Sequence, residues 1–272
     1  MESTLFNVEN KVVAITGGCG ILGIAMAKAL AKNGVKVALL DRNTAGADEL
    51  KDEAHQNGWT VNAYRTDVLD EDTIRDTRNQ VLADFGTVDV LINAAGGNMP
   101  GATVGPDQSV LDLSSGDIRK VLELNYLGTV IPTQVFLEHM IEKKAGNIIN
   151  ISSMSAQRPL TRVMGYSSSK AAIDNYTRWM AVELATKFGE GLRVNAMAPG
   201  FFLTRQNETL LTNGDGSLTA RGKTIIEHTP FRRFGTPEEL VGTLIWLISD
   251  ASRFVTGAVV PIDGGFNAFS GV

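Results

Sequence analysis

Cysteine and histidine are scarce in this sequence of 272 residues, which contains one cysteine, Cys19, and three histidines. A single cysteine excludes an internal disulfide framework and is typical of a reducing compartment. These few residues have no metal-ligand spacing, so we predict no metal site. Cys19 falls where a helix is expected to begin, a place that can activate a thiol, but an inert loop residue is the favoured interpretation.

Positive charge is also scarce. The chain has 25 lysines and arginines against 30 aspartates and glutamates, a formal net charge of −5, which argues against nucleic acid or an anionic membrane as the main partner. No apolar run approaches the length of a membrane span, and the first ten residues, MESTLFNVEN, carry neither the basic nor the apolar part of a signal peptide. We therefore expect a cytoplasmic protein that acts on a small molecule.

Short apolar runs alternate with longer helical patterns along the chain, as in KVVAIT followed by ILGIAMAKALAKNG and then VKVALLD. The apolar runs are nearly continuous, which is typical of strands buried on both faces of a parallel sheet. The alternation predicts an α/β fold with a doubly wound parallel sheet of the Rossmann type, in a single domain over residues 1–272.

One segment, residues 201–236, breaks the alternation. It is polar, contains TNGDGS, and follows the penultimate expected strand. Ligands of open α/β sheets bind outside the carboxyl ends of the strands. We therefore expect this segment to cover a substrate.

The stretch TGGCGILG, residues 16–23, joins the first expected strand to the first expected helix. From Gly18 it fits G-x-G-x-x-G; from Thr16 it nearly fits T-G-x-x-x-G-x-G, with Ile21 where a glycine is expected. Such a turn lets backbone N–H groups approach a pyrophosphate at a helix N-terminus. The residues predicted to bind there are Gly17, Gly18, Gly20, Ile21, Leu22 and Gly23.

The second expected strand ends in an acid, Asp41, followed by Arg42. A carboxylate at this place accepts both hydroxyls of a ribose and repels a 2′-phosphate, so Asp41 favours NAD over NADP. Arg42 is able to hold a 2′-phosphate, but a solvated surface charge is the favoured interpretation.

The candidate catalytic residues lie in the segment INISSMSAQRPLTRVMGYSSSKAA. Tyr166 and Lys170 are one helical turn apart and project from one face, and Ser153 follows a buried strand. An ammonium and a positive nicotinamide ring favour the phenolate of a tyrosine, and a serine hydroxyl can bind the substrate oxygen. The whole chain from about Val8 resembles the short-chain dehydrogenase/reductase family, with its Y-x-x-x-K motif.

The resemblance implies a role for each of these residues. Tyr166 is expected to be the general acid/base, and Lys170 to lower the pKa of Tyr166 and bind the nicotinamide ribose. Ser153, rather than Ser152, is expected to orient the carbonyl. Asn125, in LNYLG, matches the asparagine that holds a proton-relay water beside the lysine.

Further motifs of the family match in order along the chain. The family's NNAG occurs here with its second asparagine replaced, and the glycine turn with Ile21 is interpreted as a variant register. The resemblance implies that the cofactor is contacted by Asn93, Ala94, Ala95 and Gly96, by the adenine-pocket pair Asp67 and Val68, and by Pro199, Gly200 and Thr204 at the nicotinamide end.

The second half of the chain, together with AAGGNMP and SSMSAQRPLT, is similar to the D-mannonate oxidoreductase (fructuronate reductase) branch of this family. The resemblance implies NAD(H)-dependent interconversion of D-mannonate and D-fructuronate, and a homotetramer packed through its long helices. A hexonate needs a cation for its carboxylate. Arg158 is the first candidate and Arg205 the second; Arg162 and Arg221 lie near the same expected cleft.

Two alternatives stay open at this stage. A related sugar-acid or polyol dehydrogenase, such as a gluconate 5-dehydrogenase, shares the catalytic residues and differs only in its pocket. A catalytically silent NAD-binding protein is the other alternative, although it has no need for all four of Ser153, Tyr166, Lys170 and Asn125.

Overall fold

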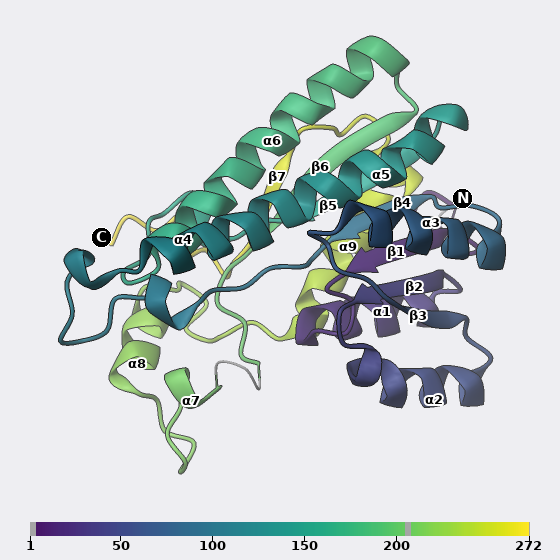
Figure 1. Ribbon diagram of the computed structural model, residues 1–272. Coiled ribbons are helices and arrows are strands. Elements are labelled where there is room, and N and C mark those ends of the chain that lie inside the picture. The colour runs from purple at the N-terminus through teal and green to yellow at the C-terminus, as the bar shows by residue number, and fades with distance from the viewer. Residues whose placement is uncertain (1–3, 205–207, 272) are drawn as a thin grey trace.

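The computed structural model describes residues 4–204 and 208–271. Within them, seven strands form one sheet in the order β3-β2-β1-β4-β5-β6-β7, and every neighbouring pair is parallel (Figure 1). The predicted doubly wound parallel sheet is therefore confirmed. The strands are β1 Val12–Thr16, β2 Lys36–Asp41, β3 Val61–Arg65, β4 Val90–Asn93, β5 Gly146–Ile151, β6 Leu192–Pro199 and β7 Val259–Ile262.

Helices connect the strands and cover both faces of the sheet. α3 shows how the sequence sets their ends: the Asp70 carboxylate accepts hydrogen bonds from two backbone N–H groups of the first turn, and the helix ends at Gly86 with φ of 81°. The helices are α1 Ile21–Lys32, α2 Asp48–Asn57, α3 Glu71–Phe85, α4 Ser115–Leu122, α5 Gly128–Glu142, α6 Met164–Phe188, α7 Glu208–Leu211, α8 Ala220–Glu227 and α9 Val241–Ile248.

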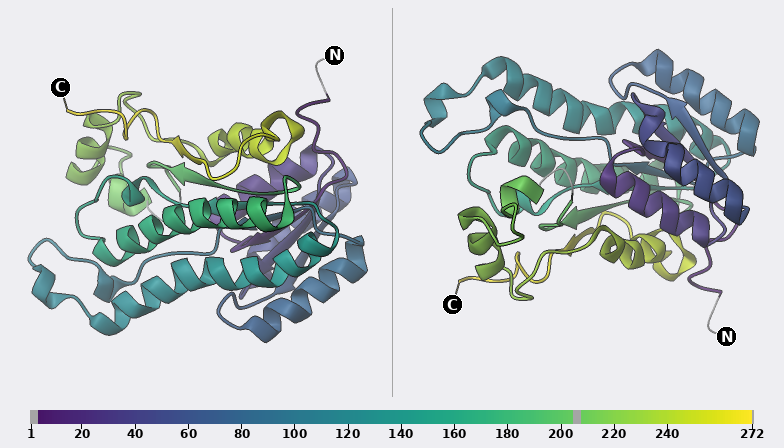
Figure 2. Two further views of the ribbon diagram at one scale, coloured as in Figure 1. Left: turned by 90° about the horizontal axis from the view of Figure 1, so that it is seen from above. Right: turned by 90° about the horizontal axis from the view of Figure 1, so that it is seen from below.

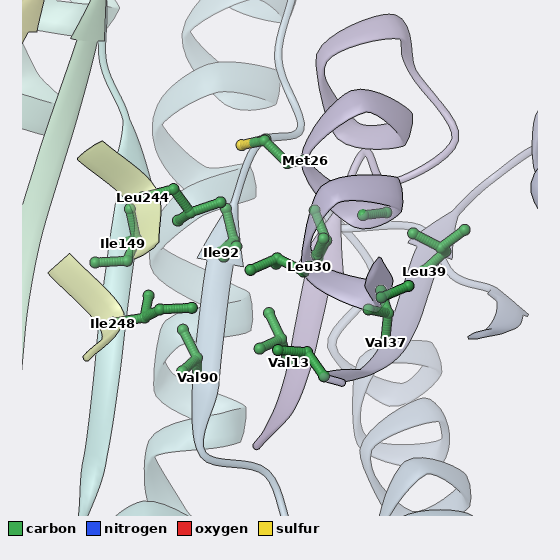
Figure 3. Packing of buried hydrophobic residues seen from close by; sticks show 14 of the residues in the cluster. Val13, Met26, Leu30, Val37, Leu39, Val90, Ile92, Ile149, Leu244 and Ile248 are labelled. Carbon is green, nitrogen blue, oxygen red and sulfur yellow. The ribbon is translucent and has the colours of Figure 1, made fainter. Parts of the chain in front are cut away.

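The molecule has three layers, which Figure 2 shows from two sides. Helices α1, α2 and α9 pack on one face of the sheet and α3, α5 and α6 on the other, each group forming its own apolar cluster with the strands. In Figure 3, Met26 and Leu30 of α1 and Leu244 of α9 lie over Val13 and Ile92 of the central strands. These side chains are fully buried, and burial of each contributes about 1.5–3 kcal/mol.

The segment over residues 201–236 leaves the sheet after β6 and contains α7, a β-bridge between Thr212 and Leu218, and α8. Figure 1 shows α7 and α8 apart from the helices that flank the sheet. Its return to β7 passes through α9. Among the described residues, none of the helices has the length and apolarity needed to cross a membrane.

Candidate active site

A cavity of about 520 Å³ opens where β1, β4, β5 and β6 end. The structure brings most of the predicted site residues into its wall. These are Gly17, Gly20, Ile21, Leu22, Gly23, Asp41, Arg42, Val68, Ala94, Ala95, Gly96, Ser153, Tyr166, Pro199, Gly200 and Thr204. Residues that are distant in sequence thus meet at one edge of the sheet, as expected for an open α/β fold.

The glycine turn is shaped by close backbone contacts. Gly17 has φ of 60°, and a Cβ there would lie 2.7 Å from Ala95 Cα. A Cβ on Gly23, in the first turn of α1, would lie 2.6 Å from the Gly17 oxygen. Ile21 is the first residue of α1 and is 37% exposed on the cavity wall. A side chain therefore fits at position 21, which explains why this chain does not need the glycine of the family pattern there.

Asp41 stands at the end of β2 on the cavity wall. One carboxylate oxygen accepts a hydrogen bond from Cys19 N–H at 3.2 Å, and the other from Asn43 N–H at 3.2 Å. Burial, with the Asp41 carboxylate second, raises the pKa of the Cys19 thiol to about 11. A thiol with that pKa stays protonated at neutral pH, as the interpretation of Cys19 as an inert loop residue requires.

Four predicted cofactor residues do not line the cavity: Gly18, Asp67, Asn93 and Lys170, the last of which is described below. Gly18 donates its N–H to the Leu40 carbonyl at 3.2 Å, and the Asp67 carboxylate accepts from Leu69 N–H. Asn93 is buried beneath the cavity, where its Nδ2 donates to Thr133 Oγ1 and Asn150 Oδ1, each at 2.9 Å. The structure therefore places Asn93 in the frame of the site, where it ties β4 to β5 and α5.

Thr16 explains how the NNAG-like loop holds its shape without the second asparagine. Its Oγ1 accepts hydrogen bonds from the backbone N–H groups of Ala94 and Ala95, both at 3.2 Å. These contacts use the main chain, so they do not depend on the side chain at position 94. The end of β1 thereby fixes the loop after β4.

Tyr166 and Ser153 both line the cavity, and their side chains are hydrogen-bonded to each other. Ser153 caps the short helix η5, Met154–Ala156, and its Oγ accepts hydrogen bonds from Ser155 N–H and Ser155 Oγ. Burial raises the pKa of Tyr166, and the hydrogen bond with Ser153 lowers it. The phenol is therefore held in its protonated form beside a serine hydroxyl, an arrangement suited to proton donation.

Lys170 lies one turn after Tyr166 on α6 and is only 4% exposed. Its Nζ donates to the Ile151 carbonyl at 2.7 Å and lies 5.6 Å from the centroid of the Tyr166 ring. Burial lowers the pKa of Lys170 to about 8, and Asp174 opposes that shift. The distance between the ammonium and the Tyr166 ring is short enough for a charge effect on the phenol, and the expectation that Lys170 lowers the pKa of Tyr166 stays a prediction.

Asn125 is fully buried in a π-helical turn, η4 Glu123–Leu127. Its Nδ2 donates to the carbonyls of Gly97 and Val121, and its Oδ1 accepts from Gly97 N–H. A Cβ on Gly96 would lie 2.6 Å from Asn125 Oδ1 and 3.3 Å from Lys170 Nζ. The amide and the ammonium thus flank Gly96 at the cavity wall, and π-turns are frequent at functional sites.

Several wall residues were not predicted from the sequence. Phe201 and Phe202 follow β6, and the Phe201 ring packs edge-on against Phe266 with centroids 5.2 Å apart. The other unpredicted wall residues are Leu40, Thr66, Leu124, Ile151 and Ser152. Five of these seven stand at or just after a strand end, which is the signal that could have found them; the exceptions are Leu40 and Leu124.

The candidate arginines have different surroundings. Arg158 is exposed, and its Nε and Nη2 donate to the Asn267 carbonyl at 3.1 and 2.6 Å, which ties the loop after β5 to the C-terminal segment. Arg221 on α8 is partly buried, and burial, with Arg162 second, lowers its pKa. Arg205 lies outside the described residues.

Comparison with known proteins agrees with this geometry. The family model for the short chain dehydrogenase matches residues 11–214. A Bacillus subtilis protein named "Uncharacterized oxidoreductase UxuB" is 46% identical over 98% of each chain. The 5-keto-D-gluconate 5-reductase of Escherichia coli is 32% identical over 96% of this chain and 97% of its own.

A solved structure extends the agreement to three dimensions. The crystal structure of a "putative D-Mannonate oxidoreductase" from Haemophilus influenzae with bound NAD is 46% identical, covers 98% of each chain and has a TM-score of 0.91. Both the family model and these relatives span most of the chain. The protein therefore belongs to the short-chain dehydrogenase family and is an oxidoreductase.

Proposed function

We propose that this protein is an NAD(H)-dependent oxidoreductase that interconverts D-mannonate and D-fructuronate. The observation that carries the proposal is that Ser153 and Tyr166 line the same cavity as the glycine turn, with the Lys170 ammonium 5.6 Å from the centroid of the Tyr166 ring. Support for the substrate is the 46% identical Haemophilus influenzae structure described above.

The residues that line the cavity are suited to binding a dinucleotide. The space beside Gly17, Gly20 and Gly23 lies at the N-terminus of α1, where backbone N–H groups and the helix dipole favour a pyrophosphate. Asp41 at the rim can accept two ribose hydroxyls and disfavours a 2′-phosphate. We infer that Lys170 and Thr204 hold the opposite, nicotinamide end.

The residues of the chain would divide the reaction as follows. When bound, the nicotinamide supplies a hydride to the carbonyl carbon, or takes one from the alcohol carbon. Tyr166 donates its phenolic proton to the carbonyl oxygen during reduction and accepts that proton during oxidation. Ser153 donates a hydrogen bond to the same oxygen as negative charge develops on it. Lys170 orients the ribose and favours the phenolate that reduction leaves behind.

A hexonate substrate also needs a site for its carboxylate. We infer that Arg158 and Arg205 supply this charge, as the sequence indicated, with Arg158 positioned by Asn267 near Gln157 and the Ser153 loop. Residues 201–236 begin at the cavity through Phe201, Phe202 and Thr204. This position supports their proposed role in covering the substrate.

A second candidate activity is reduction of a related keto acid such as 5-keto-D-gluconate, favoured by the 32% identity with the Escherichia coli reductase. It uses the same catalytic residues and differs in the pocket alone. A silent NAD-binding protein is disfavoured, because Tyr166 and Ser153 offer a proton path that binding does not require.

We infer a homotetramer from the exposed apolar side chains of the long helices. Trp179 and Val182 on α6 are 58% and 68% exposed, and Leu122 and Leu127 near the end of α4 are partly exposed. α4 and α6 lie side by side in Figure 1. Large exposed apolar side chains of this kind favour burial against another copy.

The test is a panel of keto acids with the purified protein. NADH oxidation is followed with D-fructuronate, 5-keto-D-gluconate and an uncharged ketose, and each is repeated with NADPH. We expect the highest kcat/KM for D-fructuronate with NADH. Faster turnover of 5-keto-D-gluconate would support the second candidate, and cofactor binding with no turnover of any substrate would overturn both.

A further inference from the structure

A buried carboxylate follows Lys170 on α6 and has no place in the motifs considered so far. Asp174 is on α6, one helical turn after Lys170, and is 4% exposed. A buried acid is costly unless a charge or hydrogen bonds compensate it. Its surroundings therefore indicate what it does.

Asp174 joins two elements of the site. The hydroxyl of Ser152, which directly precedes Ser153, donates a hydrogen bond to Asp174 Oδ1. The side chain of Gln157 also hydrogen-bonds the carboxylate. The end of β5 and the loop after η5 are therefore both fastened to α6 at this point.

Gln157 extends the connection to the C-terminal segment. Its Oε1 accepts a hydrogen bond from Asn267 Nδ2 at 2.6 Å, and Asn267 N–H donates to Asp263 Oδ2 at 2.7 Å. The backbone carbonyl of Asn267 also accepts a hydrogen bond from the Arg158 guanidinium. One hydrogen-bonded path thus leads from the segment after β7 to the Asp174 carboxylate.

We propose that Asp174 is a positioning residue, which keeps Lys170 in its ammonium form at the cofactor site and fixes the strand end that carries Ser153. Asn267 steadies this carboxylate through Gln157. The proposal rests on the proposed function only for the contact of Lys170 with a cofactor; the charge state of Lys170 is a property of the chain itself.

The charges around the pair support this role. Lys170 and Arg178, both on α6, are the charged groups that act on Asp174, while Ser152 and Gln157 contribute neutral donors from the neighbouring segments. For Lys170, burial favours the neutral amine and Asp174 is the charge that opposes it. Loss of the carboxylate should therefore release the proton of Lys170 at a lower pH.

The first test measures Lys170 directly, without cofactor or substrate. Protein labelled with ¹³C at lysine Cε is titrated by NMR, and the Lys170 signal is assigned with Lys170→Arg. Asp174→Asn, which keeps the shape and removes the charge, should lower the titration midpoint of Lys170 by about one pH unit. Glu183→Gln, a neutralised acid on the same helix that pairs with Lys187, should leave it unchanged.

The second test measures NADH binding by fluorescence at two pH values. With a midpoint lowered from about 8 to about 7, Asp174→Asn should bind NADH about fivefold more weakly at pH 8 and nearly as well as the wild type at pH 6. An equal loss at both pH values would indicate a merely structural role and overturn the proposal. An unchanged midpoint of Lys170 would also overturn it.

A third variant keeps the proposal testable if Asp174→Asn does not fold. Gln157→Ala retains the carboxylate but removes its link to Asn267, and it should produce the same pH-dependent loss of NADH affinity to a smaller extent. No loss would overturn the part of the proposal that concerns Asn267. Failure of the proposed function itself has a different signature, because Lys170→Ala would then leave NADH affinity intact.

Discussion

The strand ends and the covering segment, residues 201–236, meet at the same cavity but are built differently. At and around the strand ends the polar side chains are buried and hydrogen-bonded, as for Asn93 at the end of β4, Asn125 in η4 and Lys170 on α6. In the covering segment large apolar side chains are exposed, with Leu210 at 63% and Phe231 at 68%. A fully satisfied network of buried hydrogen bonds specifies one arrangement of its side chains, whereas an exposed segment tolerates changes in its sequence.

This difference separates reaction from substrate choice. Changes at the strand ends should impair turnover of every substrate, because they alter the groups that we propose move the proton and hold the cofactor. Changes around the covering segment should alter the preference between substrates and leave the reaction intact. Members of one family can therefore share Ser153, Tyr166 and Lys170 and act on different molecules.

The largest effect is expected for Tyr166→Phe. It removes one hydroxyl, so the fold and NADH binding should persist while kcat falls about 10²–10⁴-fold, the usual contribution of general acid–base catalysis. The effect should be the same for charged and uncharged substrates. Tyr64→Phe, whose hydroxyl bonds Asp84 away from the cavity, is the matched control. Substantial activity of Tyr166→Phe would mean that another group carries the proton.

Lys170→Ala should lower both turnover and NADH affinity. The wild type should show the related pH dependence: because the pKa of Lys170 is about 8, its ammonium is present below that pH and is lost above it. NADH affinity measured by fluorescence should weaken as the pH rises through about 8. A variant that loses turnover but keeps its NADH affinity would contradict the ribose contact.

Arg158→Ala tests substrate choice rather than the reaction itself. A charge-assisted bidentate contact contributes about 1.5–3 kcal/mol, so KM for a keto acid should rise about ten- to a hundredfold. KM for an uncharged ketose should barely change, and so should both values in the exposed control Arg253→Ala. If Arg158→Ala affects both substrates equally, its bond to Asn267 serves the fold alone.

Asp41→Ala should have the smallest effect. Removing the carboxylate that accepts the ribose hydroxyls should shift the ratio of kcat/KM for NADH and NADPH toward NADPH by about tenfold, with Arg42 then free to pair the 2′-phosphate. Turnover at saturating NADH should stay close to that of the wild type. A wild-type preference for NADPH would refute the role assigned to Asp41.

Sequence reasoning predicted the parts of the molecule that local patterns encode. Continuous apolar runs predicted the sheet, and the helical spacing of Tyr166 and Lys170 predicted that these two candidate catalytic residues share one face of a helix. The partner of Arg158 was not predictable, because Asn267 lies 109 residues away and reaches it only after folding. The burial of Asn93 and the π-turn around Asn125 likewise depend on how α5 packs against β4 and β5.

The central claim, that this chain passes hydride to a keto acid and a proton through Tyr166, is tested most directly by isotope transfer. The protein is incubated with NADH deuterated at the transferable C4 position and D-fructuronate, and the product is analysed by mass spectrometry. The account predicts D-mannonate that carries the deuterium, formed by the wild type and almost not at all by Tyr166→Phe. Product without deuterium, or equal formation by Tyr166→Phe, would contradict it.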